Sequence, residues 1–303
     1  MEEGRGVNGP GVPDKAAVSV VVVTHHPDPG FPSRFEVAAR ECGGAVVVDN
    51  ASNATALAMI EREVTRHDAH LIRNPTNRGL AAALNQGAAW AFDRGYAFIL
   101  VLDQDSEPMP GIVAELRRVH DAARASARTA VVGSNFIDPT TRQPRFRAGE
   151  TADGWTPMRT VIMSGSLIER EAFREIGPFR EEFFVDSVDD DLCFRARANS
   201  FQVALTTRPL LRHSIGAPTV HHVAGLRIAT SNHSADRRYR MVRNRLVLCR
   251  EYGSREPKWA VASILSVLSE ALAVTLLERD RAAKLRSVAV GVVHGLFGRT
   301  GHR

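Results

Sequence analysis

Two carboxylates one residue apart, Asp103 and Asp105, are the clearest candidates for chemistry in this sequence. An uninterrupted apolar run from Phe98 to Leu102 precedes them, which is typical of a strand buried on both faces. In an extended backbone residues i and i+2 project to the same side, so both carboxylates can approach one cation while Gln104 points away. Such oxygens suit hard divalent ions such as Mg²⁺ or Mn²⁺. A polar turn after a strand would give the same pattern, so the motif needs support from the rest of the chain.

A second acidic group lies farther along the chain, next to a predicted helix. Its members are Asp186, Asp189, Asp190 and Asp191. Negative charge is favoured at helix N-termini, which accounts for about two of the four. Crowded carboxylates raise one another's pKa toward the working range of a general base. We therefore expect a catalytic base in this group.

His213 is a candidate metal ligand, because neutral imidazole binds divalent ions. It follows a strand that we predict over residues 202–206. A lone histidine is more often structural than a ligand. Together with Asp105 it could nevertheless complete a metal site.

The elements that must position these residues follow from hydrophobic patterning. Apolar runs predict strands at 18–23, 45–48, 69–73, 98–102, 130–134 and 160–168. Helical spacing predicts helices between most of them, which describes a Rossmann-like half with right-handed crossovers. No G-x-G-x-x-G fingerprint is present, so a dinucleotide cofactor is disfavoured. Asp49, after the second strand, could accept hydrogen bonds from a base or ribose, or simply form a turn.

Composition places the chain among globular proteins. A length of 303 residues with 44% hydrophobic content is enough for a large core, and the net charge of +5 would favour an anionic substrate or membrane surface. Cys42, Cys193 and Cys249 form no disulfide framework, which indicates a reducing compartment. Residues 1–17 lack the apolar core of a signal peptide. We expect a cytoplasmic enzyme whose N-terminus, residues 1–17, is flexible.

Read together, the strand-end motifs carry a resemblance to a known family. They are Thr24-His25-His26-Pro27, Val48-Asp49-Asn50-Ala51-Ser52, the stretch from Asn77 to Gly87, Leu102-Asp103-Gln104-Asp105-Ser106, Ser164-Gly165, Phe184-Val185-Asp186-Ser187-Val188-Asp189, His213-Ser214-Ile215-Gly216 and Arg243-Asn244-Arg245. Over residues 18 to 300 the sequence resembles the inverting GT-A glycosyltransferases of family 2 type. Among them it is most similar to bacterial rhamnosyltransferases that use dTDP-rhamnose.

This resemblance implies an α/β fold of GT-A type, a Rossmann-like mixed sheet flanked by helices, over residues 18–230. Thr24, Asp49, Asn77, Asn85, Asp103 and Gln104 would then hold the nucleotide sugar. Asp103, Asp105 and His213 would bind a divalent metal, Mg²⁺ or Mn²⁺, and Asp189 would be the catalytic base. His25 and His26 replace the usual Tyr-Asn, Leu192 a usual Trp, and Arg240 a common Tyr, which puts donor and acceptor identity in doubt.

Residues 231–303 are expected to form a helical extension. A basic helix over 237–252 precedes a largely apolar stretch over 259–277 that contains Glu270. The stretch is barely long enough to span a bilayer, and a central acid disfavours insertion. A helix on the membrane surface, a subunit contact in a homo-oligomer and packing on the main domain remain open.

The activity predicted from these features is metal-dependent transfer of L-rhamnose from dTDP-rhamnose to a hydroxyl of a cell-surface glycan or lipid-linked intermediate. One alternative is a UDP-hexose-dependent glycosyltransferase, and another is an inactive scaffold that binds nucleotide sugars. A nucleotidyltransferase is disfavoured because no Gly-rich, basic triphosphate loop follows the first strand. Nucleic-acid binding is disfavoured because aromatic residues do not interleave with the basic ones.

Overall fold

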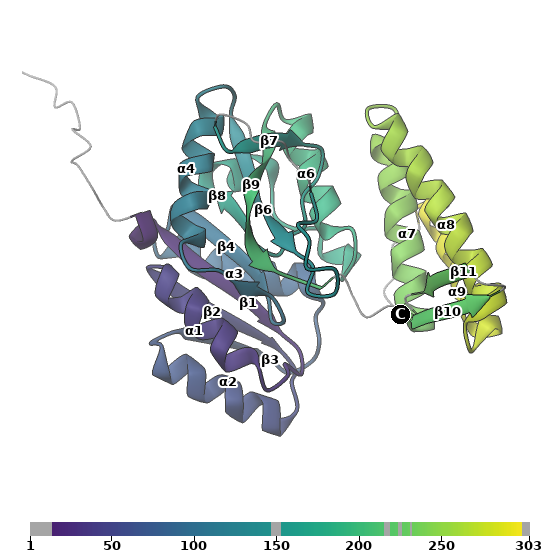
Figure 1. Cartoon of the computed structure of the whole chain (residues 1–303), viewed down its shortest axis with the longest axis horizontal. Coiled ribbons are helices and arrows are strands. Elements are labelled where there is room, and N and C mark those ends of the chain that lie inside the picture. Colours follow the sequence, from purple (N-terminus) through teal and green to yellow (C-terminus); the bar gives the residue numbers. More distant parts are fainter. Residues whose placement is uncertain (1–13, 147–152, 215–218, 224–225, 231, 299–303) are drawn as a thin grey trace, which may run out of the picture.

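The computed structural model of the chain describes residues 14–146, 153–214, 219–223, 226–230 and 232–298. A twisted central sheet has helices on both faces, and three long helices follow at the C-terminal side (Figure 1). Of the predicted flexible N-terminus, residues 1–13 lie outside the described residues, and Asp14–Ala17 form a short 3₁₀ turn.

The central sheet has nine strands in the described part of the chain. They are β1 (Val18–Thr24), β2 (Gly44–Asn50), β3 (His70–Asn74), β4 (Phe98–Asp103), β5 (Glu107–Pro108), β6 (Thr129–Ile137), β7 (Trp155–Met158), β8 (Ser166–Glu169) and β9 (Gln202–Arg212). Their order is β3-β2-β1-β4-β8-β6-β9-β5, with β7 paired to β9. The sheet is mixed, as predicted from the resemblance.

Helices cover both faces because the strands are apolar on both sides. They are α1 (Phe31–Glu41), α2 (Ala54–Arg66), α3 (Leu80–Asp93), α4 (Ile112–Arg124), α5 (Arg170–Ile176) and α6 (Val188–Ala198). One core joins alternate strand residues such as Val21 and Val101 to α3, α5 and α6. The other joins Val20 and Leu100 to α1, α2 and α4. The continuous apolar runs therefore contribute to two cores at once, which is expected of strands covered on both faces.

The direction of the strands brings distant residues to one edge of the sheet. β1, β2 and β4 are parallel. β8 is antiparallel to both β4 and β6, and β9 is parallel to β6. Consequently β1, β2, β4 and β9 all end at the same edge, where open α/β sheets bind ligands.

Two sequence predictions about elements were wrong in extent. The strand expected over 160–168 is regular only from Ser166, because Gly165 adopts φ +79° and the chain turns there. The strand expected over 202–206 continues to Arg212, because register shifts against β6 accommodate Pro209. Of the four acids expected beside a helix, Asp186 precedes α6, and Asp189, Asp190 and Asp191 lie in its first turn.

The C-terminal part contains α7 (Ala235–Tyr252), α8 (Pro257–Leu277) and α9 (Arg281–Phe297), beside a hairpin of β10 (Thr219–Val223) and β11 (Leu226–Thr230). In Figure 1, α7 lies nearest the sheet and α8 and α9 lie beyond it. The amide of Asn244 on α7 donates to the carbonyls of Phe183, Val185 and Asp186, each at 2.9 Å. These bonds fix α7 against the loop that precedes α6. A division of the chain at residue 230 stays a prediction.

Candidate active site

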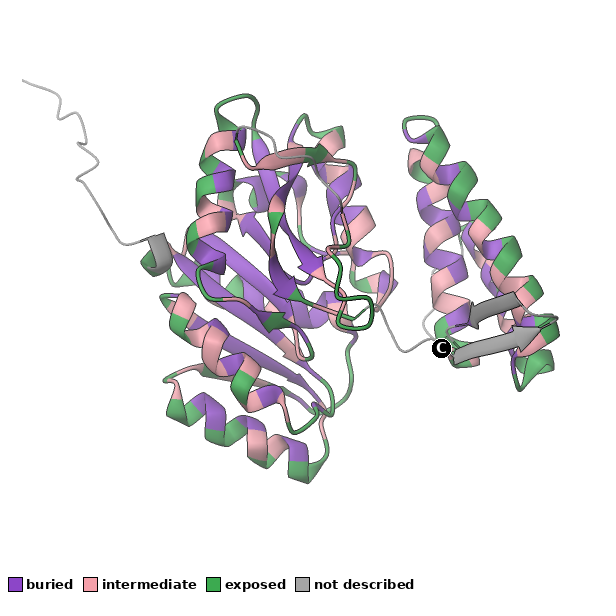
Figure 2. Ribbon diagram, viewed as in Figure 1, coloured by how far each residue is buried: buried purple, intermediate pink, exposed green. Residues whose placement is uncertain are grey.

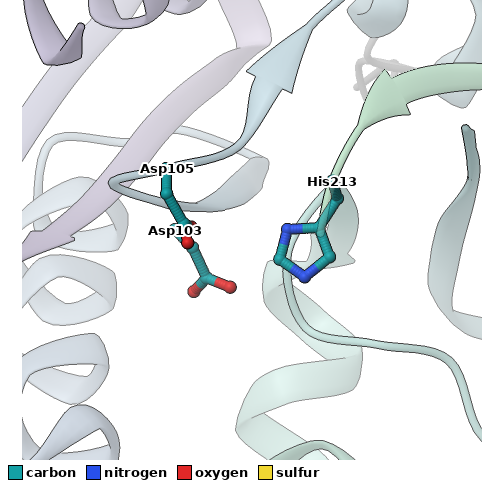
Figure 3. Close-up of side chains that lie close together, drawn as sticks. All are labelled: Asp103, Asp105 and His213. Carbon is teal, nitrogen blue, oxygen red and sulfur yellow. The ribbon is translucent and has the colours of Figure 1, made fainter. Parts of the chain in front are cut away.

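Asp103, Asp105 and His213 meet at the sheet edge (Figure 3). One ligand atom from each lies within 4.8 Å of the others. Asp103 is the last residue of β4, Asp105 is in the turn after it, and His213 directly follows β9. The ring of His213 packs edge-on against Phe136 with centroids 5.6 Å apart. The structure therefore brings together the three residues that were predicted to bind a metal.

A chain of hydroxyl groups supports this cluster. Ser106 Oγ lies 2.8 Å from His213 Nδ1 and 2.7 Å from Ser164 Oγ. Ser164 Oγ accepts a hydrogen bond from the backbone N–H of Asp103 at 2.9 Å. Because Nδ1 is engaged by Ser106, Nε2 is the ring nitrogen left for a ligand. Partners of this kind orient metal-binding histidines.

Burial at the end of β4 changes the ionisation of Asp103. The pKa of Asp103 is raised to about 6, mainly by burial. The charge of His213 lowers this pKa, and the carboxylate of Asp105 raises it. Two carboxylates held this close repel each other when both are ionised. A divalent cation between them would relieve that repulsion.

A cavity of about 610 Å³ connects this cluster to the second acidic group. Its lining includes Asp103, Asp105, His213 and Asp189. The N-terminal turns of α3 and α7 and the backbone around Gly79 and Phe184 complete it. The predicted metal ligands and the predicted base therefore share one cavity.

Asp189 has the environment of a general base. It is half-buried in the first turn of α6 and accepts the backbone N–H of Asp190 at 3.0 Å. Burial, followed by the charge of Asp190, raises the pKa of Asp189 to about 7. The preceding residues Phe184, Asp186 and Ser187 all have positive φ, between 61° and 63°. Such strained backbone occurs often at functional sites, and here it precedes the helix turn that presents Asp189.

Of the other three acids in the group, two are held in ion pairs and Asp190 is absent from the lining of the cavity. Asp191 is fully buried and accepts from Arg195 Nε at 2.8 Å and Arg180 Nη1 at 3.3 Å. Asp186 lines the cavity but forms a two-bond ion pair with Arg237 on α7. Burial raises the pKa of Asp190, whose charge also interacts with that of Asp189. Among the four, Asp189 is thus the one available to substrate.

The predicted nucleotide-binding residues divide into two sets. Asn77 and Gln104 line the cavity. Asp49 is only 2% exposed, with its oxygens accepting from Thr24 Oγ1 at 2.9 Å and from a backbone N–H at 3.0 Å. Asn85 holds the backbone of Phe179 by two bonds of 2.9 Å. Thr24, Asp49 and Asn85 are absent from the lining of the cavity, although Thr24 directly follows Val23, which pairs with Asp103 in the sheet.

Several residues that were not predicted as site residues take part in the cavity. Asn50 lines it and donates to the carbonyl of Gly79 at 2.9 Å, which fixes the loop that holds Asn77. His25 also lines it. The backbone N–H of His25 donates to Oε1 of Gln104 at 2.7 Å, and Nε2 of Gln104 donates to the carbonyl of His25 at 3.1 Å. The position of Asn50 directly after Asp49, at the end of a predicted strand, could have identified it as a site residue.

The first turns of α7 supply a further set of cavity residues: Asp236, Arg237 and Arg240. Arg240 pairs with Asp236 at 2.9 Å and stacks on Phe184, with its guanidinium 4.0 Å from the ring centroid. Sequence patterning places these residues on a basic helix but cannot show that the helix returns to the sheet edge. The resemblance had singled out Arg240 as a departure from the family pattern, but Asp236 and Arg237 carry no local signal.

Comparisons with known proteins found a matching family model and a relative of similar length. Residues 45–177 match the family described as Glycosyl transferase family 2. The chain is 28% identical over 304 aligned residues to the dTDP-rhamnosyl transferase RfbF of Shigella flexneri, covering 94% of this chain and 97% of that protein.

Solved structures share the fold at low sequence identity. One is the mannosyltransferase PcManGT from Pyrobaculum calidifontis in complex with GDP-Man and Mn²⁺, with a TM-score of 0.55, 14% identity, and coverage of 93% of this chain and 88% of that one. Another is S. aureus TarS, with a TM-score of 0.54, 14% identity and 93% coverage of this chain. The chain spans 44% of the length of that TarS structure. The fold is of the GT-A type.

Proposed function

We propose that this chain is a glycosyltransferase that moves L-rhamnose from dTDP-rhamnose to a glycan hydroxyl with inversion at the anomeric carbon. The match of residues 45–177 to Glycosyl transferase family 2 and the GT-A fold support this proposal. The observation that carries the reaction type is the single cavity that joins Asp103, Asp105 and His213 to Asp189. The sugar and nucleotide rest on the similarity to the Shigella flexneri protein over nearly the whole of both chains.

The donor set fits a divalent metal. Two carboxylates and one imidazole, with ligand atoms within 4.8 Å of one another, suit Mg²⁺ or Mn²⁺, whereas no thiol is in the cluster to favour softer metals. A bound ion would neutralise negative charge on the leaving nucleoside diphosphate. The hydroxyl chain through Ser106 holds the imidazole in place for such an ion.

Asp189 is proposed to remove the proton from the acceptor hydroxyl as that oxygen attacks the anomeric carbon. With a pKa of about 7, much of Asp189 is ionised near neutral pH, and its carboxylate is more basic than an ordinary aspartate. General base catalysis of this kind contributes roughly 10²- to 10⁴-fold. Because the base and the diphosphate site lie in the same cavity, one displacement with inversion is sufficient.

Donor recognition is assigned to the residues that reach the cavity. We propose that Asn77 and Gln104 contact the nucleotide directly. Thr24 and Asp49 would support the donor site indirectly, because the hydrogen bond between them ties the ends of β1 and β2 together. Asn85 would act on the loop before α6 through Phe179.

The test is donor binding by titration calorimetry and transfer by product analysis. The purified chain is mixed with Mg²⁺ or Mn²⁺ and with dTDP-rhamnose, UDP-glucose, UDP-galactose or GDP-mannose. We expect metal-dependent binding of dTDP-rhamnose that Asp103→Ala abolishes. Asp189→Asn is the matched control, which should keep donor binding and lose transfer. Preference for a UDP-sugar would overturn the donor assignment, and no binding of any nucleotide sugar would overturn the proposed activity.

A further inference from the structure

The outer surface of α8 and α9 is the most unusual surface of the described chain. All ten large hydrophobic side chains that are exposed in the described residues lie on these two helices. They are Val261, Ile264, Leu265, Leu268, Leu272, Leu276, Val290, Val293, Leu296 and Phe297. We call this set the α8–α9 apolar face. Figure 2 shows exposed residues along the side of α8 that faces away from the sheet.

The α8 part of this face forms one stripe, because its six residues recur every three or four positions along the helix. Their exposed fractions, up to 61% for Leu268, give an area on the order of 600 Å², the upper end for the largest apolar patch of a typical monomer. Between Trp259 and Leu277 the only charged residue is Glu270. The open side of α8 over that stretch therefore consists of apolar residues, serine and threonine.

Both ends of α8 carry positive charge. Arg255 and Lys258 are exposed at its start. Beyond its end three arginines, Arg279, Arg281 and Arg286, are exposed against one exposed acid, Asp280. No ion pair joins any of these five cations to another described residue. The apolar face thus has unpaired cations at both ends.

The charges decide between the possible partners. In an antiparallel pair of α8 helices from two copies, Lys258 of one copy would meet Arg279 of the other. In a parallel pair, each cation would meet the same residue of the other copy. Either arrangement places like charges together, which opposes self-association. An anionic bilayer surface complements apolar and basic groups at the same time.

Glu270 determines how α8 could meet a bilayer. Its carboxylate accepts from Arg238 Nη1 at 2.9 Å and Arg245 Nη1 at 3.0 Å, both on α7. α8 is long and apolar enough to cross a membrane by composition. Crossing would pull Glu270 away from two arginines and into hydrocarbon, which is unfavourable. The helix can keep these ion pairs only by lying on the surface.

We propose that the α8–α9 apolar face docks the protein on an anionic lipid bilayer, with α8 and α9 lying in the interface. The end of α8 nearest Glu278 is tied by Arg238 to the turn of α7 that supplies Arg237 and Arg240 to the cavity. In the docked protein, α7 would therefore lie between the cavity and the helices that contact the lipid surface. This inference goes beyond the proposed function and does not depend on it.

The test is vesicle flotation of the full chain with phosphatidylcholine alone and with added phosphatidylglycerol. The chain should float with the anionic vesicles, and less so as salt rises. Leu265→Gln combined with Leu268→Gln and Leu272→Gln should abolish flotation. These side chains are exposed, so circular dichroism and dTDP-rhamnose binding should match those of the parent chain.

The basic groups are tested separately. At about fivefold for each basic residue near an anionic surface, Arg279→Gln with Arg286→Gln should lower partitioning about 25-fold. Arg62→Gln with Arg208→Gln is the matched control, because both arginines are exposed and lie outside α8 and α9. The control pair should float like the parent chain.

Three results would overturn the proposal. They are no flotation with anionic vesicles, flotation that ignores phosphatidylglycerol, and flotation unchanged by the three leucine substitutions. A dimer in light scattering that these substitutions convert to a monomer, without vesicle binding, would instead show that a second copy covers the face. Donor binding measured on the same samples separates failure of docking from failure of the proposed function.

Discussion

Replacement of Asp189 by asparagine should remove activity and stabilise the fold at the same time. Asparagine keeps the shape of the side chain but carries no charge. Burial and the charge of Asp190 raise the pKa of Asp189 from 3.8 to about 7 in the folded chain. At about 1.4 kcal/mol for each pKa unit, ionised Asp189 therefore lowers the free energy of unfolding by up to about 4 kcal/mol.

The sign of this effect depends on pH. At acidic pH below 3.8 the carboxyl is neutral in both states and carries no penalty. As pH rises to about 7 the unfolded chain ionises first, so stability falls through this window and stays low above it. Because the side chain is only half-buried, solvent screening reduces the penalty, and we expect Asp189→Asn to gain about 2 kcal/mol at mildly alkaline pH. The gain should vanish toward the acidic end.

Denaturant unfolding at alkaline and acidic pH measures this gain, with transfer rates recorded on the same samples. The parent kcat/KM should rise with pH through about 7, while Asp189→Asn should lose roughly 10²- to 10⁴-fold. Asp191→Asn is the matched control. Burial also raises the pKa of Asp191, but its neutralisation would leave Arg195 without the carboxylate that it pairs with, so we expect a loss of about 3 kcal/mol. An Asp189→Asn chain no more stable than its parent at alkaline pH would refute the argument from burial.

Three further substitutions test the supports of the site and the helices. Ser106→Ala should lower Mn²⁺ affinity about 10- to 100-fold by freeing the ring of His213, and an unchanged titration would contradict that role. Gly79→Ala should cost at least about 1 kcal/mol, since φ is +85° and a Cβ would lie 2.6 Å from the ring of Phe184; an unchanged melting temperature would argue against this. Glu278→Gln should destabilise by about 3 kcal/mol in denaturant unfolding by weakening bonds to two buried cations, whereas a neutral effect would mean that the buried pairs contribute nothing net.

The sequence was sufficient for the strands of the first half because their signal is local. Phe98 to Leu102 is a continuous apolar run, Val18 to Val23 is valine except for Ser19, and both form strands of the sheet. The same locality explains the error after residue 206. Polar residues and Pro209 end the apolar run, but a register shift against β6 lets β9 continue beyond them.

Pairing between distant side chains could not be read from the sequence. The four acids near α6 are similar in sequence, yet Asp191 pairs with Arg180 and Asp186 pairs with Arg237. Asp49 is a predicted ligand-binding residue at a strand end, and in the structure its carboxylate accepts a hydrogen bond from the hydroxyl of Thr24, a contact that the sequence does not predict. Only the fold assigns each acid its partner, so the sequence predicts a group of candidates more reliably than it predicts which member is free.

The metal cluster illustrates what strand direction adds to a motif. Asp103 and His213 are far apart in the chain, and neither one identifies the other. They meet because β4 and β9 run in the same direction within one sheet, so both strands end at the same edge. β9 reaches that edge only because it continues past Pro209 to Arg212. A strand ending at Thr206 would leave His213 without a fixed position. The irregular pairing of β9 is therefore a requirement of the site, since it carries the third ligand to the two carboxylates.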